Sequence, residues 1–213
     1  MEFTGFPVAA LDFYEDLEVD NSKSFWTAHK PTYDEAVRAP MEALCALLAP
    51  EFGPAKIFRP YRDVRFAKDK TPYKTSQGGF VATGPATGFY VSVSARGVYA
   101  GGGFYDADGP RLAAFRDAIV DDAAGRRLAR IVGDLKRGGW EISGERLKTT
   151  PRGYAADHPR IELLRHKSLG AGKSYGFDEV IHTAGLADVV REDWRRLRPL
   201  INWLDRLEVE PSG

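Results

Sequence analysis

The residues Phe89-Tyr90-Val91-Ser92-Val93-Ser94-Ala95 form the clearest β-strand pattern of the chain. Phe89, Val91, Val93 and Ala95 alternate with Tyr90, Ser92 and Ser94, and a period of two places the two sets on opposite faces of a sheet. Arg96-Gly97 follows as a tight turn, and Val98 to Phe104 returns as a second strand. The pattern therefore predicts an antiparallel hairpin at the centre of the fold.

Further strand patterns precede this hairpin at residues 57–66 and 79–83, and a short one follows at residues 140–143. Apolar residues at helical spacing occupy most of the remaining chain. Three helices are expected near the N-terminus: one from Pro7 past Leu17, one from a cap at Asn21 to Pro31, and one from Pro31 onward with a kink at Pro40. Residues 112–135 form two helices or one interrupted helix. The last two expected helices run from Asp157-His158-Pro159 to Arg165 and from Leu186 to Leu207, the latter with a bend at Pro199.

This order of helices, consecutive strands and helices indicates an α+β fold. We expect an antiparallel or mixed central sheet with the N-terminal and C-terminal helices packed on it. The regular βαβ alternation of dinucleotide-binding folds is missing from the sequence. Because no internal repeat or low-complexity linker divides the chain, we expect residues 1–213 to form a single domain.

The composition is that of an ordinary soluble globular protein, with 43% hydrophobic and 28% charged residues in a chain of 213. No run approaches the roughly 18 apolar residues that span a bilayer, and no secretory pattern opens the chain, so we expect no membrane partner. Cys45 is the only cysteine, which excludes an intrachain disulfide and favours a cytoplasmic location. Its apolar neighbours predict a core residue rather than a nucleophile.

Basic and acidic residues number 30 each, so the net charge is zero, which argues against binding of duplex nucleic acid. This balance hides an uneven distribution along the chain. Residues 58–75 and residues 146–167 each hold six basic and two acidic residues. We therefore look for an anion site in these two basic segments.

The first basic segment contains Arg59, Arg62 and Arg65, followed by Lys70 and Tyr73. Arginine offers a planar fork to carboxylate or phosphate, and lysine adds a mobile charge. On a regular strand Arg62 faces away from the other two arginines, so Pro60 or a bulge must re-aim one of them if all reach one ligand. Asp63 orients an arginine or serves as a general base.

The second basic segment contains Lys148, Arg152 and Tyr154, and it leads to the expected helix start at His158. The free amides and the dipole of a helix N-terminus favour anions. The charge clamps of the predicted site are therefore Arg59, Arg62, Arg65, Lys70, Lys148 and Arg152, with Tyr73 and Tyr154 as hydrogen-bond donors. Asp63 and His158 form the most plausible acid–base pair.

A long charged motif runs through the first segment as Arg59, Arg62, Asp63, Arg65 and Phe66, followed by Asp69, Lys70 and Tyr73. It resembles the R-x-x-R-D-x-R-F…D-K-x-x-Y signature of a widespread, mainly bacterial family of conserved proteins of unknown function. The resemblance covers nearly the whole chain, from Gly5-Phe6-Pro7 and residues 26–30 to Arg198-Pro199-Leu200. It supports the location of the site and implies no established activity.

Other motifs carry less chemistry. Gly172-Lys173-Ser174 lacks the earlier glycine of a phosphate-binding loop, and we interpret it as a flexible turn. The glycines at 101–103 end a strand or admit another backbone. The four histidines show no zinc-ligand spacing, so we expect no dedicated metal site, although a carboxylate-only magnesium site leaves little signature. No motif identifies a cofactor.

Three hypotheses for function follow. The first is a protein, enzyme or not, that binds an anionic small ligand bearing phosphate or carboxylate through the two basic segments. The second is a non-enzymatic module that docks an acidic protein or a short single-stranded nucleic acid on the cations and the interleaved aromatic residues. The third is purely structural, with the arginines paired to acidic residues of the N-terminal helices.

Overall fold

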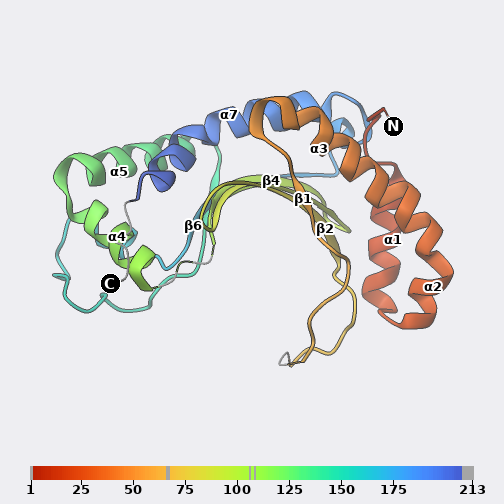
Figure 1. Cartoon of the computed structure of the whole chain (residues 1–213), viewed down its shortest axis with the longest axis horizontal. Coiled ribbons are helices and arrows are strands. Elements are labelled where there is room, and N and C mark those ends of the chain that lie inside the picture. The colour runs from red at the N-terminus through yellow and green to blue at the C-terminus, as the bar shows by residue number, and fades with distance from the viewer. Residues whose placement is uncertain (1, 66–67, 106, 108, 208–213) are drawn as a thin grey trace. The chain divides into compact units, whose positions relative to one another are not determined.

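The computed structural model describes residues 2–65, 68–105, 107 and 109–207, and its elements confirm the α+β class (Figure 1). Six strands form one antiparallel sheet in the order β1-β2-β3-β4-β6-β5. The strands are β1 (Lys56–Ile57), β2 (Ser76–Gly84), β3 (Thr87–Ser94), β4 (Gly97–Phe104), β5 (Glu141–Ser143) and β6 (Leu169–Gly176). No described helix is long and apolar enough to cross a bilayer.

The predicted central hairpin is confirmed as strands β3 and β4. The alternating side chains of Val91 and Val93 are buried, while Ser92 and Ser94 are partly exposed. Gly97 follows the turn with a φ of +88°, and a Cβ atom there would lie 1.7 Å from the carbonyl oxygen of Gly176. A glycine is therefore required at this position both by the backbone conformation and by the close approach of β6.

The chain divides into two compact units, which are described separately below. Strands β2, β3, β4 and β6 and helix α7 (Leu186–Asp205) each contribute residues to both units. Whether the chain is the single domain expected from the sequence stays a prediction. Unit 1 comprises Met1–Val81, Tyr90–Ala100 and Ser174–Glu192, and unit 2 comprises Ala82–Phe89, Gly101–Lys173 and Asp193–Gly213.

The N-terminal helices of unit 1 pack side by side, beginning with α1 (Val8–Val19) after Pro7 (Figure 1). The hydroxyl of Ser22 caps α2 (Lys23–Thr32) by accepting a hydrogen bond from the Phe25 amide at 3.2 Å, so the predicted cap at Asn21 is wrong. The amide side chain of Asn21 instead bonds the backbone of Tyr73. It is thus a tertiary contact that local sequence does not reveal.

The predicted helix end at Pro31 is also wrong, because helical structure continues to Phe52. After α2, a π-helix, η1 (Tyr33–Arg38), leads directly into α3 (Ala39–Phe52). Here the Ala39 amide donates to the Asp34 carbonyl, one residue further back than in an α-helix. Cys45 on α3 is buried, as expected, and burial raises the pKa of its thiol to about 12.

Unit 2 holds two separate helices, α4 (Gly109–Val120) and α5 (Asp122–Arg137), which resolves the alternative left open for residues 112–135. Asp121 separates them and caps α5 by accepting from the Ala124 amide at 2.7 Å. Phe104, Phe115 and Trp203 form an aromatic core beneath these helices. Gly103 admits a neighbouring backbone, because a Cβ atom there would lie 2.2 Å from the Leu169 carbonyl oxygen.

Three further sequence predictions need correction. The expected strand over residues 57–66 is a strand only at Ile57, and its last residue, Phe66, lies outside the described residues. Gly172-Lys173-Ser174 is part of strand β6 rather than a flexible turn. The helix after Pro159 is a single turn, α6 (Ile161–Leu164), and a 3₁₀ helix, η2 (Glu179–His182), precedes α7.

Candidate functional site

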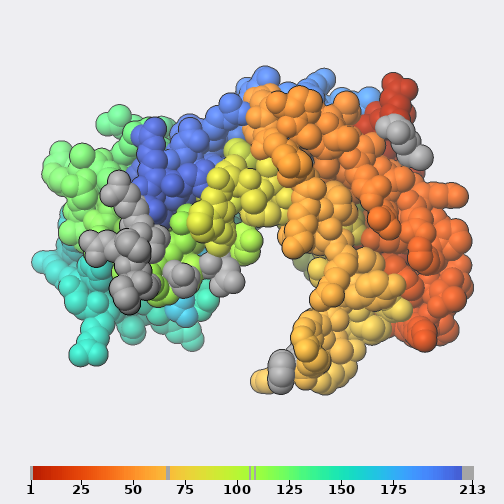
Figure 2. Space-filling view, viewed as in Figure 1, coloured from red at the N-terminus to blue at the C-terminus, as the bar shows by residue number. Residues whose placement is uncertain are grey.

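The first basic segment forms a hairpin that we call the basic hairpin (residues 58–75). Its two arms are joined by hydrogen bonds from the Arg62 amide to the Pro72 carbonyl at 2.9 Å and from the Lys74 amide to the Pro60 carbonyl at 2.8 Å. Tyr61 and Tyr73 face each other in an isolated β-bridge. Figure 2 shows the gold segment projecting from the neighbouring residues of unit 1.

The base of the basic hairpin is held against helix α2. The side-chain amide of Asn21 donates to the Tyr73 carbonyl at 3.1 Å and accepts from the Tyr73 amide at 3.0 Å. The ring of Tyr73 stacks on Trp26, with 4.3 Å between centroids and an interplanar angle of 7°. Tyr73 is therefore buried against Trp26, and its role as a hydrogen-bond donor to a ligand stays a prediction.

Most charged residues near the tip of the basic hairpin are paired with one another. Arg62 donates from Nη1 to Asp69 at 2.5 Å and to Thr71 Oγ1 at 2.7 Å. Arg65 contacts Asp63 through Nε at 3.0 Å and Nη2 at 2.6 Å. The partners of these arginines are acids of the hairpin itself, so the expectation that the N-terminal helices supply them is wrong.

The pKa values of the hairpin acids follow from these contacts. The amide and hydroxyl of Thr71, together with Arg62, lower the pKa of Asp69 to about 2. The hydrogen bond from the Arg65 side chain lowers the pKa of Asp63. A carboxylate stabilised in its charged form is a weaker base, which disfavours Asp63 for general-base chemistry. Its catalytic role, with His158 as its partner, stays a prediction.

Arg59 differs from the other motif arginines, because the described chain holds no hydrogen bond or ion pair to its side chain. It lines a pocket of about 260 Å³ at the base of the basic hairpin, within unit 1. We call this space the Arg59 pocket. Its lining includes Trp26, Lys30, Asp34, Arg38, Arg59 and Tyr61.

Four of these residues, Trp26, Lys30, Asp34 and Arg38, recur every fourth position along α2 and η1. This spacing places them along one face of a continuous helical segment. Sequence reasoning missed them because the helix was expected to end at Pro31, in the middle of the stripe. The spacing itself was the available signal.

The polar groups of this stripe are only partly satisfied. Lys30 forms an ion pair with Asp34, and Arg38 donates from Nε to Glu42 at 2.8 Å. Among the residues that the structure describes, Trp26 Nε1 and Asp34 Oδ1 are buried without a hydrogen-bond partner. Such groups are rare in folded proteins, and each calls for an explanation.

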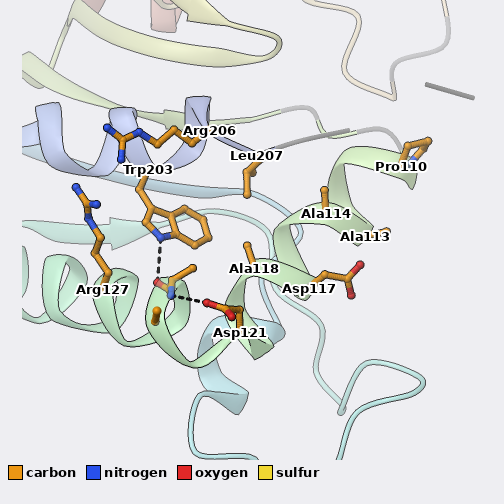
Figure 3. A pocket seen from close by; sticks show the side chains of 12 residues that line it. Pro110, Ala113, Ala114, Asp117, Ala118, Asp121, Arg127, Trp203, Arg206 and Leu207 are labelled. Atoms are coloured by element: carbon orange, nitrogen blue, oxygen red, sulfur yellow. Dashed lines mark hydrogen bonds between the residues drawn. The ribbon is translucent and has the colours of Figure 1, made fainter. Parts of the chain in front are cut away.

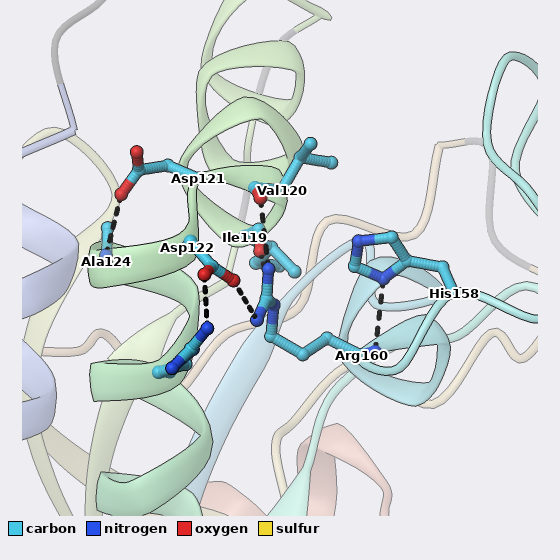
Figure 4. Close-up of polar contacts among 8 residues, drawn as sticks. Ile119, Val120, Asp121, Asp122, Ala124, His158 and Arg160 are labelled. Carbon is cyan, nitrogen blue, oxygen red and sulfur yellow. Dashed lines mark hydrogen bonds and ion pairs between the residues drawn. The ribbon is translucent and has the colours of Figure 1, made fainter.

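The second basic segment lies in unit 2, and its main structural residue is Arg160 (Figure 4). The guanidinium donates to the carbonyls of Ile119 at 2.7 Å and Val120 at 3.0 Å, and it lies 3.3 Å from Asp122. His158 Nδ1 accepts the Arg160 amide at 3.1 Å. Arg160 therefore ties the second segment to the junction between α4 and α5.

The predicted ligand residues of this segment are more exposed. Lys148 and Arg152 are exposed, and their side chains form no hydrogen bond or ion pair with the residues that the structure describes. The Tyr154 hydroxyl lies 3.5 Å from Asp117 Oδ1, at the outer limit of a hydrogen bond. That these residues complete one site with the basic hairpin stays a prediction, since the two segments belong to different units.

Unit 2 also contains a larger pocket of about 780 Å³, between α4, the start of α5 and the end of α7 (Figure 3). Its floor is formed by alanines such as Ala114 and Ala118 and by Trp203, whose indole donates to the Ala124 carbonyl at 3.0 Å. Asp117, Asp121, Arg127 and Arg206 also line it. Charges of both signs here give no preference for an anion.

No group of three or more His, Cys, Asp or Glu side chains is placed to hold a metal ion in the described part of the chain. The chain matches the model of a family described as "Conserved hypothetical protein (DUF2461)" over residues 9–203. No curated protein matches the chain. The family match supplies no activity, so a function must be argued from the residues of the site.

Proposed function

We propose that this chain, which belongs to the DUF2461 family of conserved hypothetical proteins, binds a phosphate- or carboxylate-bearing small ligand in the Arg59 pocket. The observation that carries the proposal is the position of Arg59. It lines a pocket while the described residues leave its guanidinium without an ion pair, whereas Arg62 and Arg65 are occupied by hairpin acids. Arg59 thus keeps its fork for a ligand.

The charge around the pocket supports the same ligand class. Lys30, Arg38 and Arg59 stand against Asp34 among the lining residues, so positive charge is in excess. Part of this excess is offset by Glu42, which pairs with Arg38. The remaining positive charge of the pocket matches a single bound phosphate or carboxylate group better than it matches a polyanion.

The local backbone also favours a binding site here. Tyr33, Asp34 and Arg38 lie in the π-helix η1, and short π-helical insertions occur frequently at functional sites. Within η1, Asp34 pairs with Lys30 of α2, and Arg38 pairs with Glu42 of α3.

The test is a thermal-shift screen followed by calorimetry on the tightest binder found. The screen contains ribose 5-phosphate, adenosine 5′-monophosphate (AMP) and citrate. Because a charge-assisted two-point contact is worth about 1.5–3 kcal/mol, Arg59→Ala should weaken this binder at least about tenfold. The matched control is Arg96→Ala, which removes an exposed arginine of unit 1 outside the pocket.

Equal losses in Arg59→Ala and Arg96→Ala would contradict the proposal, because they would report only the overall charge. Losses in Arg62→Ala or Arg65→Ala as large as that in Arg59→Ala would move the ligand to the tip of the hairpin. That result would favour the interaction-module hypothesis, which is also supported by the half-exposed Tyr61 beside exposed cations. Binding would then weaken steeply with salt.

A further inference from the structure

The aromatic side of the Arg59 pocket offers an open ring. Tyr61 is 49% exposed, although it lies within a cluster of rings. Its described ring neighbours, Trp26 at 6.0 Å and Tyr73 at 5.5 Å, meet it at tilted angles of 54° and 47°. Because neither ring stacks on Tyr61, the tyrosine retains a face on which a planar ligand can stack.

Two residues that line the pocket, Trp26 and Asp34, carry buried polar atoms of opposite hydrogen-bonding direction. Trp26 is 4% exposed and its Nε1 is a donor, while Asp34 Oδ1 is an acceptor, and both atoms are unpartnered within the described residues. The Asp34 side chain is 39% exposed, and its other oxygen forms the ion pair with Lys30. A dianionic phosphate accepts hydrogen bonds only and leaves Asp34 Oδ1 unsatisfied. A ring edge that carries both a donor and an acceptor satisfies both atoms.

The charges of the pocket argue against a cationic ligand. Trp26, Tyr33, Phe58 and Tyr61 line it, and aromatic residues of this kind also form cages for quaternary ammonium groups. Lys30, Arg38 and Arg59 line the same space, however, and repel a cation. The aromatic residues are therefore better suited to a ring than to an ammonium group.

We infer that the ligand of the Arg59 pocket is a phosphate ester with a planar heteroaromatic ring, of the mononucleotide class. The ring stacks on Tyr61 and its edge meets Trp26 Nε1 and Asp34 Oδ1, while the phosphate binds Arg59. The pocket of about 260 Å³ is slightly smaller than most ligand sites, which suits one ring with its phosphate extending to the exposed Arg59. This inference rests on the proposed function and specifies its ligand.

The test compares AMP with ribose 5-phosphate, adenosine and choline by calorimetry on the full chain. Stacking of one base is worth about 1–3 kcal/mol, so AMP should bind at least about fivefold tighter than ribose 5-phosphate. In Tyr61→Ala, AMP and ribose 5-phosphate should bind with equal affinity, and in Tyr61→Phe the advantage of AMP should return. The exposed ring of Tyr61 makes both variants compatible with folding, which thermal melting checks.

The outcomes separate the two proposals. If AMP and ribose 5-phosphate bind equally, and Arg59→Ala weakens both, the inference is overturned while the proposed function stands. If adenosine or choline binds as tightly as AMP, the phosphate contributes nothing and both are overturned. If an AMP advantage persists in Tyr61→Ala, the ring does not stack on Tyr61 and the inference fails. If none of these four probes binds, the inference fails, and the proposed function fails with it when citrate does not bind in the screen either.

Discussion

The two basic segments have the same charge but differ in where their arginines find partners. Residues 58–75 and 146–167 each hold six basic and two acidic residues. In the basic hairpin, the acids Asp63 and Asp69 lie within the segment and pair with Arg65 and Arg62. In the second segment, the acid Glu162 pairs with Arg146 and Arg165, while Arg160 reaches out of the segment to carbonyl groups at the junction of α4 and α5.

This difference shows that a count of charges does not tell structural cations from available ones. A cation is structural when its partner is close, whether that partner is a neighbouring acid or a distant carbonyl. By this measure Arg62, Arg65 and Arg160 are structural. Arg59 and Arg152 have no such partner in the described part of the chain, and only Arg59 lines one of the two pockets discussed above.

The largest expected effect is that of Arg160→Ala on stability. The Arg160 side chain is only 10% exposed, and its loss leaves the carbonyls of Ile119 and Val120 without their donor. We expect a loss of about 2–3 kcal/mol in the free energy of unfolding. A chain of this size should then melt roughly 4–12 °C lower, as measured by circular dichroism.

The matched control is Arg152→Ala in the same segment. Arg152 is exposed, so its removal should change the free energy of unfolding by no more than about 0.5 kcal/mol. Equal effects of the two substitutions would contradict the distinction between structural and available cations.

A smaller and more local effect is expected for Asn21→Ala. This change removes both hydrogen bonds between the Asn21 side chain, just before α2, and the Tyr73 backbone, worth about 1–2 kcal/mol together. The base of the basic hairpin should open more often, so the amides of Arg62 and Lys74 should exchange faster with deuterium. Hydrogen exchange measured by mass spectrometry or NMR reports this directly.

Ser22→Ala is the control for this prediction. It removes the cap of α2 but no hairpin contact, so it should loosen the first turn of α2 and leave the hairpin amides unchanged. Unchanged exchange at Arg62 and Lys74 in Asn21→Ala would show that Asn21 does not hold the hairpin.

The smallest expected effect is a pH dependence confined to the hairpin tip. The folded pKa of Asp69, about 2, lies below the ordinary value of about 3.9. A lowered folded pKa means that the stabilising contacts are present above about pH 4 and are lost as the pH falls toward 2. An NMR titration should show the Asp69 carboxyl and the Thr71 amide shifting together with a midpoint near 2.

In Asp69→Asn, the Thr71 amide should lose this titration, because the ionisable partner is gone. An Asp69 carboxyl that titrates near its ordinary value in the intact chain would show that Arg62 and Thr71 do not hold it. The tip of the basic hairpin would then carry charged side chains without fixed partners, like Lys148 and Arg152 of the second basic segment.

The family match shows that the chain belongs to a family of conserved hypothetical proteins, whereas the charged signature read from the sequence stays a prediction. The fold class could be predicted because alternation and helical spacing are local patterns. Strands β3 and β4 and helix α7 followed from them with errors of a few residues. Pro31 was misread because local rules treat proline as a helix end, whereas the packing of α2, η1 and α3 carries the helix past it.

The sequence by itself determined the α+β class, the family and the two segments where basic residues gather, because composition and spacing are properties of neighbours along the chain. Only the tertiary structure decided which of those cations have partners. Arg62 is paired because the hairpin folds Asp69 back onto it, and Arg59 joins Trp26 because that hairpin rests on α2. Contacts between residues distant in sequence depend on the path that the folded chain takes in space, and no local sequence pattern encodes that path.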